Sequence, residues 1–171
     1  VGSEMCIRDS LYIVHRLDKD TSGLMIFAKN RLAASNISKL FQDNQIHKYY
    51  IAITNKAFKK TSDILSNENN EKKILKSQYR RIRIANYEFA YLVKLITGRK
   101  HQIRLQFYLN NNPILGDKKY RISNKNRSQN SILMLHAHKI NFSLNGVKYN
   151  FIAEIPEVFR NFIDEKYLKI Y

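Results

Sequence analysis

Residues 15–24 read HRLDKDTSGL and join two apolar runs, residues 11–14 (LYIV) and residues 24–28 (LMIFA). The second run has the length and apolarity of a buried strand, so these ten residues form a joint next to a sheet. The joint carries two carboxylates, two hydroxyls, a glycine and several cations, which is more chemistry than a turn needs. We therefore treat it as the first candidate for an active site.

The chain of 171 residues is strongly basic. Thirty Lys and Arg residues against fourteen Asp and Glu residues give a formal net charge of +16 and a pI near 9.9. Such a charge attracts polyanions, and nucleic acid is the usual partner. No segment has the length and apolarity to span a membrane, and no long basic amphipathic helix indicates binding to a membrane surface. The single cysteine, Cys6, excludes an internal disulfide, and with no visible signal peptide we expect a cytoplasmic protein.

Hydrophobic periodicity predicts an α+β protein in which strands dominate. Residues 1–10 show no period and are predicted to be a disordered or non-native tail, and residues 55–76 are predicted to be a surface loop or hairpin. The predicted strands are residues 24–28, 49–53, 78–85 and the central strand 89–96, followed by a hairpin within 133–155 around Asn145-Gly146. The predicted helices are residues 31–41, residues 99–109 and a last helix with Pro156 at N1 and Phe159, Phe162, Ile163 and Tyr167 on its buried side.

A calcium site is the first chemistry that the joint suggests. The spacing Asp18-x-Asp20-x-Ser22-Gly23 matches the start of an EF-hand loop. That loop needs a bidentate glutamate at its twelfth position, which here is Lys29, and a cation there repels calcium. The sequence therefore argues against calcium.

A phosphatase is the second possibility. Asp18-x-Asp20-Thr21 resembles the aspartyl nucleophile motif of haloacid-dehalogenase-type phosphatases, which act with magnesium. That motif ends an unbroken apolar strand, whereas His15 and Arg16 interrupt the run here. The doubly wound βαβ succession that such enzymes need is also missing from the downstream pattern.

Chemistry on an RNA base is the third possibility. An aspartate that acts on a base or its sugar needs the base out of the stack, a cation that keeps the carboxylate ionised, and an aromatic wall. Arg16 has the length to fill the gap that a flipped base leaves. Residues 97–104 (TGRKHQIR) offer cations at a strand-to-helix junction, where a helix N-terminus also favours anions, and residues 48–52 (KYYIA) offer the aromatic wall.

Five segments, in this order, resemble the motifs of the RluA-type pseudouridine synthases. They are residues 14–28 (VHRLDKDTSGLMIFA) for the family signature, 48–52 for K-x-Y-x-A, 97–104 for T-G-R-x-H-Q-I-R, 113–117 (PILGD) for P-I-x-G-D and 135–137 (LHA) for the late L-H-A motif. The resemblance implies that residues 11–171 are a partial pseudouridine synthase catalytic domain. Its expected fold is α+β, with a mixed, mainly antiparallel central sheet flanked by helices.

The resemblance implies an enzyme that isomerises specific uridines in structured RNA to pseudouridine. Asp18 is then the catalytic aspartate, which acts on a flipped-out uridine so that the glycosidic bond breaks and the base rotates and rejoins through carbon. Tyr50 is implied to stack on the uracil and to remove the C5 proton, while Tyr49 points to the other face of the strand. Arg104 is implied to pair with Asp18 and keep the carboxylate ionised.

Four further residues are grouped as RNA-binding by the same resemblance. Arg16 is implied to insert into the RNA and Arg99 to contact a phosphate, while His101 and Gln102 are implied to orient their loop beside the RNA. The remaining polar residues of the joint, 20–22, are expected to hold its turn.

No metal and no other cofactor is expected. The implied reaction is an isomerisation without redox change. His136 and His138 share one face of a predicted strand, but no cysteine or acidic residue lies at ligand spacing, so a structural role is favoured for both.

The sequence departs from the family pattern at its N-terminus. The resemblance begins near Leu11, and neither the N-K-P-x-G segment nor the S4 domain found in many members is present, so we expect a catalytic domain that is incomplete there. The expected partner is RNA, with ribosomal RNA ahead of transfer RNA, and a monomer is expected. The alternative function is a non-catalytic RNA-binding module, and the phosphatase ranks below it.

Overall fold

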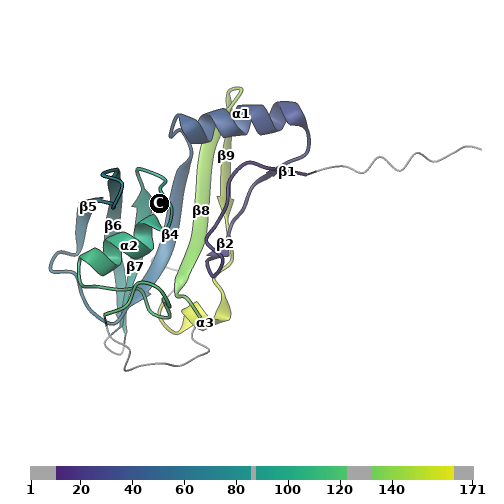
Figure 1. The fold of residues 1–171 in the computed structure, drawn as a ribbon. Helices are drawn as coiled ribbons and strands as arrows, with labels where there is room; N and C mark the ends of the chain where they lie inside the picture. Colours follow the sequence, from purple (N-terminus) through teal and green to yellow (C-terminus); the bar gives the residue numbers. More distant parts are fainter. Residues whose placement is uncertain (1–10, 86–87, 123–131, 164–171) are drawn as a thin grey trace, which may run out of the picture.

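The computed structural model describes residues 11–85, 88–122 and 132–163. The main sheet has the order β2-β8-β4-β7-β6-β5, and β9 also pairs with β8 (Figure 1). Its strands are β2 (Ser22–Gly23), β4 (His47–Thr54), β5 (Ser62–Glu68), β6 (Ile74–Ala85), β7 (Glu88–Leu95), β8 (Leu135–Leu144) and β9 (Val147–Ile152). All of these pairs are antiparallel except β2 with β8, which confirms the predicted mixed, mainly antiparallel sheet.

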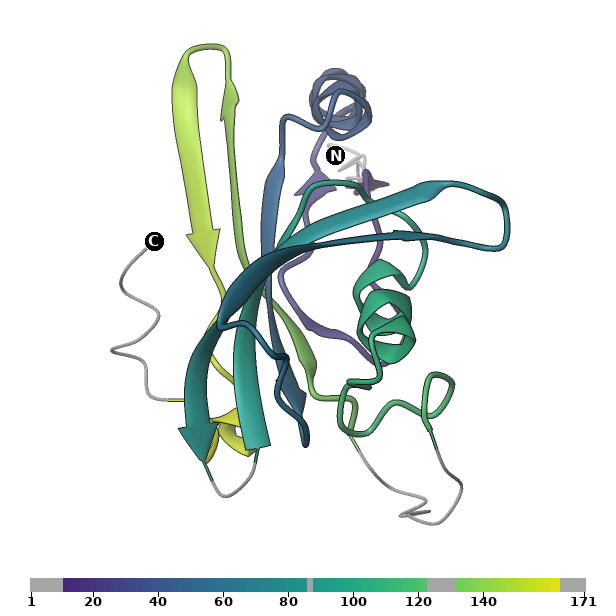
Figure 2. The ribbon, with the colours of Figure 1, turned by 90° about the vertical axis from the view of Figure 1, so that its left-hand side faces the viewer.

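A small sheet and three helices complete the described fold. The small sheet pairs β1 (Tyr12–Ile13) with β3 (Phe27–Ala28), and the helices are α1 (Arg31–Gln42), α2 (Gln102–Leu109) and α3 (Glu157–Arg160). Figure 2 shows α2 and the purple segment that contains residues 15–24 on the same side of the main sheet. The predicted joint and the predicted strand-to-helix junction are therefore neighbours in space.

The central strands β4 and β7 send alternate side chains to two faces of the sheet. Tyr50 pairs with Val93 in the strand register, so the two side chains share a face. Tyr91 lies two residues before Val93 and points to the same face, where its ring is 5.8 Å from the ring of Phe107 in α2. Tyr49 points to the opposite side. We call the side that carries α2 the front face and the side that Tyr49 faces the back face.

Helix α1 begins at Arg31, as predicted. Asn30 caps the helix, because its Oδ1 accepts the backbone N–H of Ala33 at 2.8 Å. Ile37 and Leu40 are buried in a cluster with Ile140 of β8. The predicted hairpins are confirmed as well: β5 pairs with β6, and β8 and β9 meet at a tight turn in which the residues between the strands have positive φ.

The predicted buried strand at residues 24–28 is wrong in extent. Only Phe27–Ala28 is strand, and Phe27 is 44% exposed. The N–H of Leu24 donates to the carbonyl of Ala137 at 2.9 Å, so the chain is tied to β8 at the first residue of the apolar run and turns away from the main sheet after it. Apolarity alone does not separate a buried strand from one that is paired in a small, half-covered sheet.

The last helix is shorter than predicted, and Pro156 is its N-cap rather than its N1 residue. Pro156 has φ −57° and ψ 147°, an extended conformation, and its carbonyl accepts the N–H of Phe159 at 2.9 Å. Phe159 and Ile163 are buried, as predicted, whereas Tyr167 lies outside the described residues. Similarly, α2 begins at Gln102 rather than at residue 99, because His101 has a left-handed backbone with φ 53°.

The first testable consequence concerns Gly23, which ties the joint to β8. Its φ of +112° is a conformation that almost only glycine adopts, and a Cβ there would collide with the carbonyl oxygen of Ala137. Gly23→Ala is expected to lower the free energy of unfolding by about 3 kcal/mol, measured by urea denaturation.

Gly146 provides a matched control, because it also has positive φ (+78°) but nothing lies within 4 Å of the position that a Cβ would take there. Gly146→Ala is expected to cost only the backbone strain of about 1–2 kcal/mol. Equal losses in the two variants would contradict the collision at Gly23.

Candidate active site

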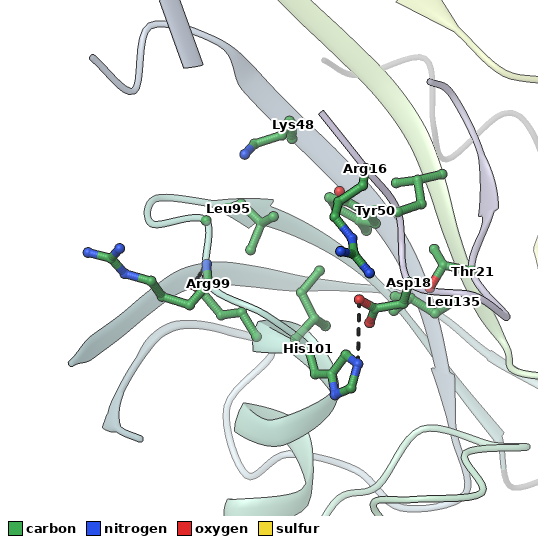
Figure 3. Close-up of a pocket in the computed structure, with 13 residues that line it drawn as sticks. Arg16, Asp18, Thr21, Lys48, Tyr50, Leu95, Arg99, His101 and Leu135 are labelled. Carbon is green, nitrogen blue, oxygen red and sulfur yellow. Dashed lines mark hydrogen bonds and ion pairs between the residues drawn. The ribbon is translucent and has the colours of Figure 1, made fainter. Parts of the chain in front are cut away.

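A pocket of about 100 Å³ opens on the front face between the joint, β4 and the start of α2 (Figure 3). Its lining residues are Arg16, Leu17, Asp18, Thr21, Lys48, Tyr50, Leu95, Gly98, Arg99, His101, Gln102, Ile103 and Leu135. Six of the seven predicted site residues are among them. The seventh, Arg104, contacts Asp18 from the first turns of α2.

Arg104 is a buried guanidinium held between two carboxylates. Its Nε and Nη2 donate to the two oxygens of Asp117, at 2.7 and 2.9 Å, and its Nη1 donates to Oδ2 of Asp18 at 3.2 Å. The side chain of Asp117 is fully buried and that of Asp18 is 22% exposed. The bidentate pair with Asp117 therefore fixes the guanidinium, and the donor left on its edge is directed at Asp18. The predicted pairing of Arg104 with Asp18 is present in the structure.

Asp117 is a site residue to which the sequence assigned no role. It follows Gly116, whose φ of +75° and close approach to the carbonyl of Ile132 leave no room for a side chain. The backbone N–H groups of Lys119 and Tyr120 both donate to Oδ1 of Asp117 at 2.9 Å. Burial raises the pKa of Asp117, but these hydrogen bonds and Arg104 outweigh burial and lower it. The signal in the sequence was the motif at residues 113–117, which ends in a carboxylate.

His101 contacts Asp18 from the other side of the pocket. Its Nε2 lies 3.8 Å from Oδ1 of Asp18, and its Nδ1 lies 3.2 Å from the hydroxyl of Tyr120. The ring of Tyr120 also faces the Arg104 guanidinium, with Cζ 5.4 Å from the ring centroid. Burial and the charge of Arg104 lower the pKa of His101, although Asp18 opposes them, so the imidazole is neutral at physiological pH. The structure thus places His101 against the predicted catalytic carboxylate.

Gln102 was grouped with RNA contacts by the sequence, but its side chain is engaged within the protein. It is 3% exposed, its Oε1 accepts from Thr97 Oγ1 at 2.8 Å and from the N–H of Arg99 at 3.0 Å, and its Nε2 donates to the carbonyl of Lys76 at 2.9 Å. Gln102 holds the loop before α2 against β6. This arrangement agrees with the loop-orienting role implied for Gln102, and its grouping with the RNA-binding residues stays a prediction.

Tyr50 forms one wall of the pocket, and the adjacent Tyr49 points to the back face, as strand alternation predicts. Burial, together with the negative charge of Asp18, raises the pKa of Tyr50 to about 12. The phenol is therefore neutral at physiological pH. Its flat face provides a surface for stacking, but it is not a ready proton acceptor.

Three cations surround the pocket mouth. Arg16 and Arg99 are exposed, and Lys48 is half-buried, with its ammonium 5.4 Å from the ring centroid of Phe41. Figure 3 shows Arg16 pointing toward Asp18, whereas Arg99 points away from it. Burial lowers the pKa of Lys48. The sequence predicted the two arginines as RNA contacts. It assigned no role to Lys48, which is the first residue of the motif at residues 48–52.

The joint is fixed at both ends by residues that take no part in lining the pocket. His15 Nε2 accepts the N–H of Ile26 at 2.8 Å, and Ser22 Oγ lies 2.9 Å from Nδ1 of His136 on β8. Between these anchors, the N–H of Thr21 donates to the carbonyl of Asp18 at 3.0 Å and closes a turn. His136 therefore has the structural role that the sequence favoured for it.

Across residues 11–85, 88–122 and 132–163, no three His, Cys, Asp or Glu side chains converge as a metal site would require. None of the helices in these ranges is long and apolar enough to cross a bilayer.

Comparison with known proteins identifies the class to which this fold and pocket belong. The structure resembles Human RNA Pseudouridylate Synthase Domain Containing 1 with a TM-score of 0.79 at 20% identity, over 89% of this chain and 72% of that one. The family model described as RNA pseudouridylate synthase matches residues 7–108. The chain therefore belongs to the RNA pseudouridylate synthase family.

Curated relatives agree with the RluA-type resemblance. An uncharacterized RNA pseudouridine synthase of Mycoplasma capricolum is 38% identical over 145 residues, which covers 75% of this chain and 47% of the relative. The ribosomal large subunit pseudouridine synthase D of Borreliella burgdorferi is 35% identical over 174 residues, which covers 91% of this chain and 52% of the relative. The chain thus spans about half the length of the curated relatives that it matches.

The carboxylate behind Arg104 gives a prediction for stability. Asp117→Asn removes the charge that balances a buried guanidinium, so the free energy of unfolding is expected to fall by about 3 kcal/mol in urea denaturation. Asp20→Asn, an exposed carboxylate in the joint, is the control and is expected to change it by less than about 0.5 kcal/mol. Similar values for both would show that Asp117 does not hold Arg104.

The buried histidines give a prediction for pH. Burial is the main cause that lowers the pKa of His15 and of His136 to about 4, from 6.5 in an unperturbed side chain. Between pH 6.5 and 4 the unfolded chain binds protons that the folded chain does not, so stability is complete above pH 6.5 and falls with acidification. The melting temperature is expected to be lower at pH 5 than at pH 7.5.

His15→Gln tests this cause, because glutamine keeps a hydrogen-bond acceptor and does not titrate. The variant is expected to show a smaller drop in melting temperature between pH 7.5 and pH 5 than the parent protein. An identical drop would remove His15 from the explanation.

Proposed function

We propose that this chain isomerises specific uridines in structured RNA to pseudouridine, with Asp18 as the catalytic aspartate. The observation that supports the proposal most directly is the position of Asp18. Its carboxylate lies in a front-face pocket, 3.2 Å from a buried guanidinium and beside an aromatic wall. A carboxylate so placed, in a protein of net charge +16, fits a site that acts on RNA rather than one that only binds it.

The pocket is the proposed site of one flipped uridine. In the proposed reaction the uridine leaves its stack and enters the pocket, and Asp18 acts on it so that the bond between C1′ and N1 breaks. The base rotates, C5 bonds to C1′, the proton on C5 leaves and N1 gains a proton, so the product is an isomer of the substrate. This balance requires no cofactor.

Tyr50 and the pocket-mouth cations have separate proposed roles. Tyr50 stacks on the uracil ring, because it presents a neutral aromatic face to the pocket. The resemblance implies that Tyr50 removes the C5 proton. Tyr50 would first have to lose its own phenol proton, and the pKa of Tyr50, about 12, opposes that loss. Arg16 and Arg99 contact the RNA, with Arg16 at the gap left by the flipped base and Arg99 at a phosphate.

Ribosomal RNA is the proposed substrate. Relatives of this chain carry the names ribosomal large subunit pseudouridine synthase C and D. The proposal is that this chain acts on a uridine of the large-subunit RNA in preference to transfer RNA.

The catalytic role of Asp18 is tested by substitution. Asp18→Asn keeps the size of the side chain and removes its charge, so it is expected to lower the isomerisation rate by at least about a thousandfold while RNA binding is kept. The rate is measured as release of tritium from C5 of labelled uridine in large-subunit ribosomal RNA, with transfer RNA as the competing substrate.

Asp20→Asn is the matched control and is expected to keep the parent rate, because Asp20 is exposed and does not line the pocket. An Asp18→Asn variant that still releases tritium would reject Asp18 as the catalytic residue. Absence of release by the parent protein on either RNA would favour the non-catalytic RNA-binding alternative.

A further inference from the structure

The back face carries a band of cationic and aromatic side chains on neighbouring strands. Tyr49 on β4 pairs with Lys94 on β7 and with Lys139 on β8 in the strand register. The two ammonium groups lie 5.9 and 5.8 Å from the centroid of its ring. The half-buried tyrosine ring, which packs against the core, therefore lies between two cations.

The band continues into a groove of about 440 Å³ across β8 and β9. The groove is lined by Gln45, His47, Lys139, Asn141, Phe142, Ser143, Lys148, Tyr149 and Asn150. None of these lining side chains is acidic. Alternation directs the stacked rings of Phe142 and Tyr149 to the opposite face, where both pack in the cluster around Ile37 and Leu40. Positive charge and amide groups are thus combined in one concave surface on the back face, next to the ring of Tyr49.

This surface is separate from the active-site pocket. Lys48 and Tyr49 are consecutive on β4, and alternation directs Lys48 to the front-face pocket and Tyr49 to the back face. The charge of Lys94 helps burial to lower the pKa of His47 at the edge of the groove, which is consistent with a positive local field. A ligand on the back face would therefore not compete for the pocket.

We propose that the band and groove, defined by Tyr49, Lys94, Lys139 and Lys148 with the groove residues around them, form a second RNA-binding surface for a single-stranded segment outside the reacting uridine. Lysines neutralise phosphates, and an aromatic ring such as that of Tyr49 stacks bases without regard to sequence. An acidic protein surface would use the cations but not the tyrosine ring between them. The inference takes from the proposed function only that the substrate is RNA.

The test uses a fluorescent single-stranded oligonucleotide of adenosine and cytidine, which contains no uridine for the pocket. Lys94→Gln/Lys148→Gln is expected to raise its Kd at least fivefold at 0.1 M salt. The slope of log K against log salt is expected to become shallower by about 1.4, because each phosphate contact in single strands contributes about 0.7. Circular dichroism confirms that the variant is folded.

Lys29→Gln/Lys39→Gln is the matched control, because it removes the same charge from two exposed lysines elsewhere. It is expected to change the Kd less than twofold. Equal weakening by both double variants would overturn the proposal, since net charge alone would then explain binding. Unchanged affinity in Lys94→Gln/Lys148→Gln would also overturn it and would leave an acidic protein as the occupant of the groove.

Asp18→Asn separates this proposal from the proposed function. It is expected to leave the affinity for the uridine-free oligonucleotide unchanged while it abolishes isomerisation. Absence of isomerisation in the parent protein would reject the proposed function alone, and the back-face binding result would stand independently of it.

Discussion

The charge arrangement around Arg104 is the constraint on which the site depends. Removing a guanidinium from water costs several kcal/mol unless its donors are paired, and here Asp117 pairs two of them in the interior. The third donor reaches Asp18 at the edge of the pocket. The two carboxylates therefore share one guanidinium, with Asp117 in the interior and Asp18 at the pocket. Arg104 thereby holds the Asp18 carboxylate at the pocket of a protein whose formal net charge is +16.

The main sheet carries polar residues on both of its faces. On the front face, α2 covers the core with Phe107 and contributes Arg104 and His101 from its first turn and N-cap. Because strand side chains alternate, Lys48 points to the front face and the next residue, Tyr49, points to the back face. The same strand, β4, therefore supplies both the wall of the pocket and the centre of the back-face band.

Much of the fold was predictable from the sequence because periodicity carries local information, whereas the contact between Asp18 and Arg104 was expected only from the family resemblance. Helix α1, the hairpins and the opposite orientations of Tyr49 and Tyr50 followed from this local information. The role of Asp117 did not, because its pairing with Arg104 depends on how the segment after α2 folds back. The burial of Gln102 was equally hidden, since its partner carbonyl belongs to Lys76 on a distant strand. Long-range partners of polar side chains are not encoded in a period of 2 or 3.6 residues.

The joint is held to the sheet by main-chain contacts in addition to the side-chain hydrogen bond between Ser22 and His136. Gly23 lies against the backbone of Ala137, and the next residue, Leu24, donates to the carbonyl of that same alanine. Backbone anchors of this kind do not depend on which side chains the exposed positions carry. Arg16, Lys19 and Asp20 are therefore open to substitution without displacing Asp18. Under the proposed function, the residues proposed to contact the RNA are not those that hold the loop in place, so the contacts can change while the loop stays anchored.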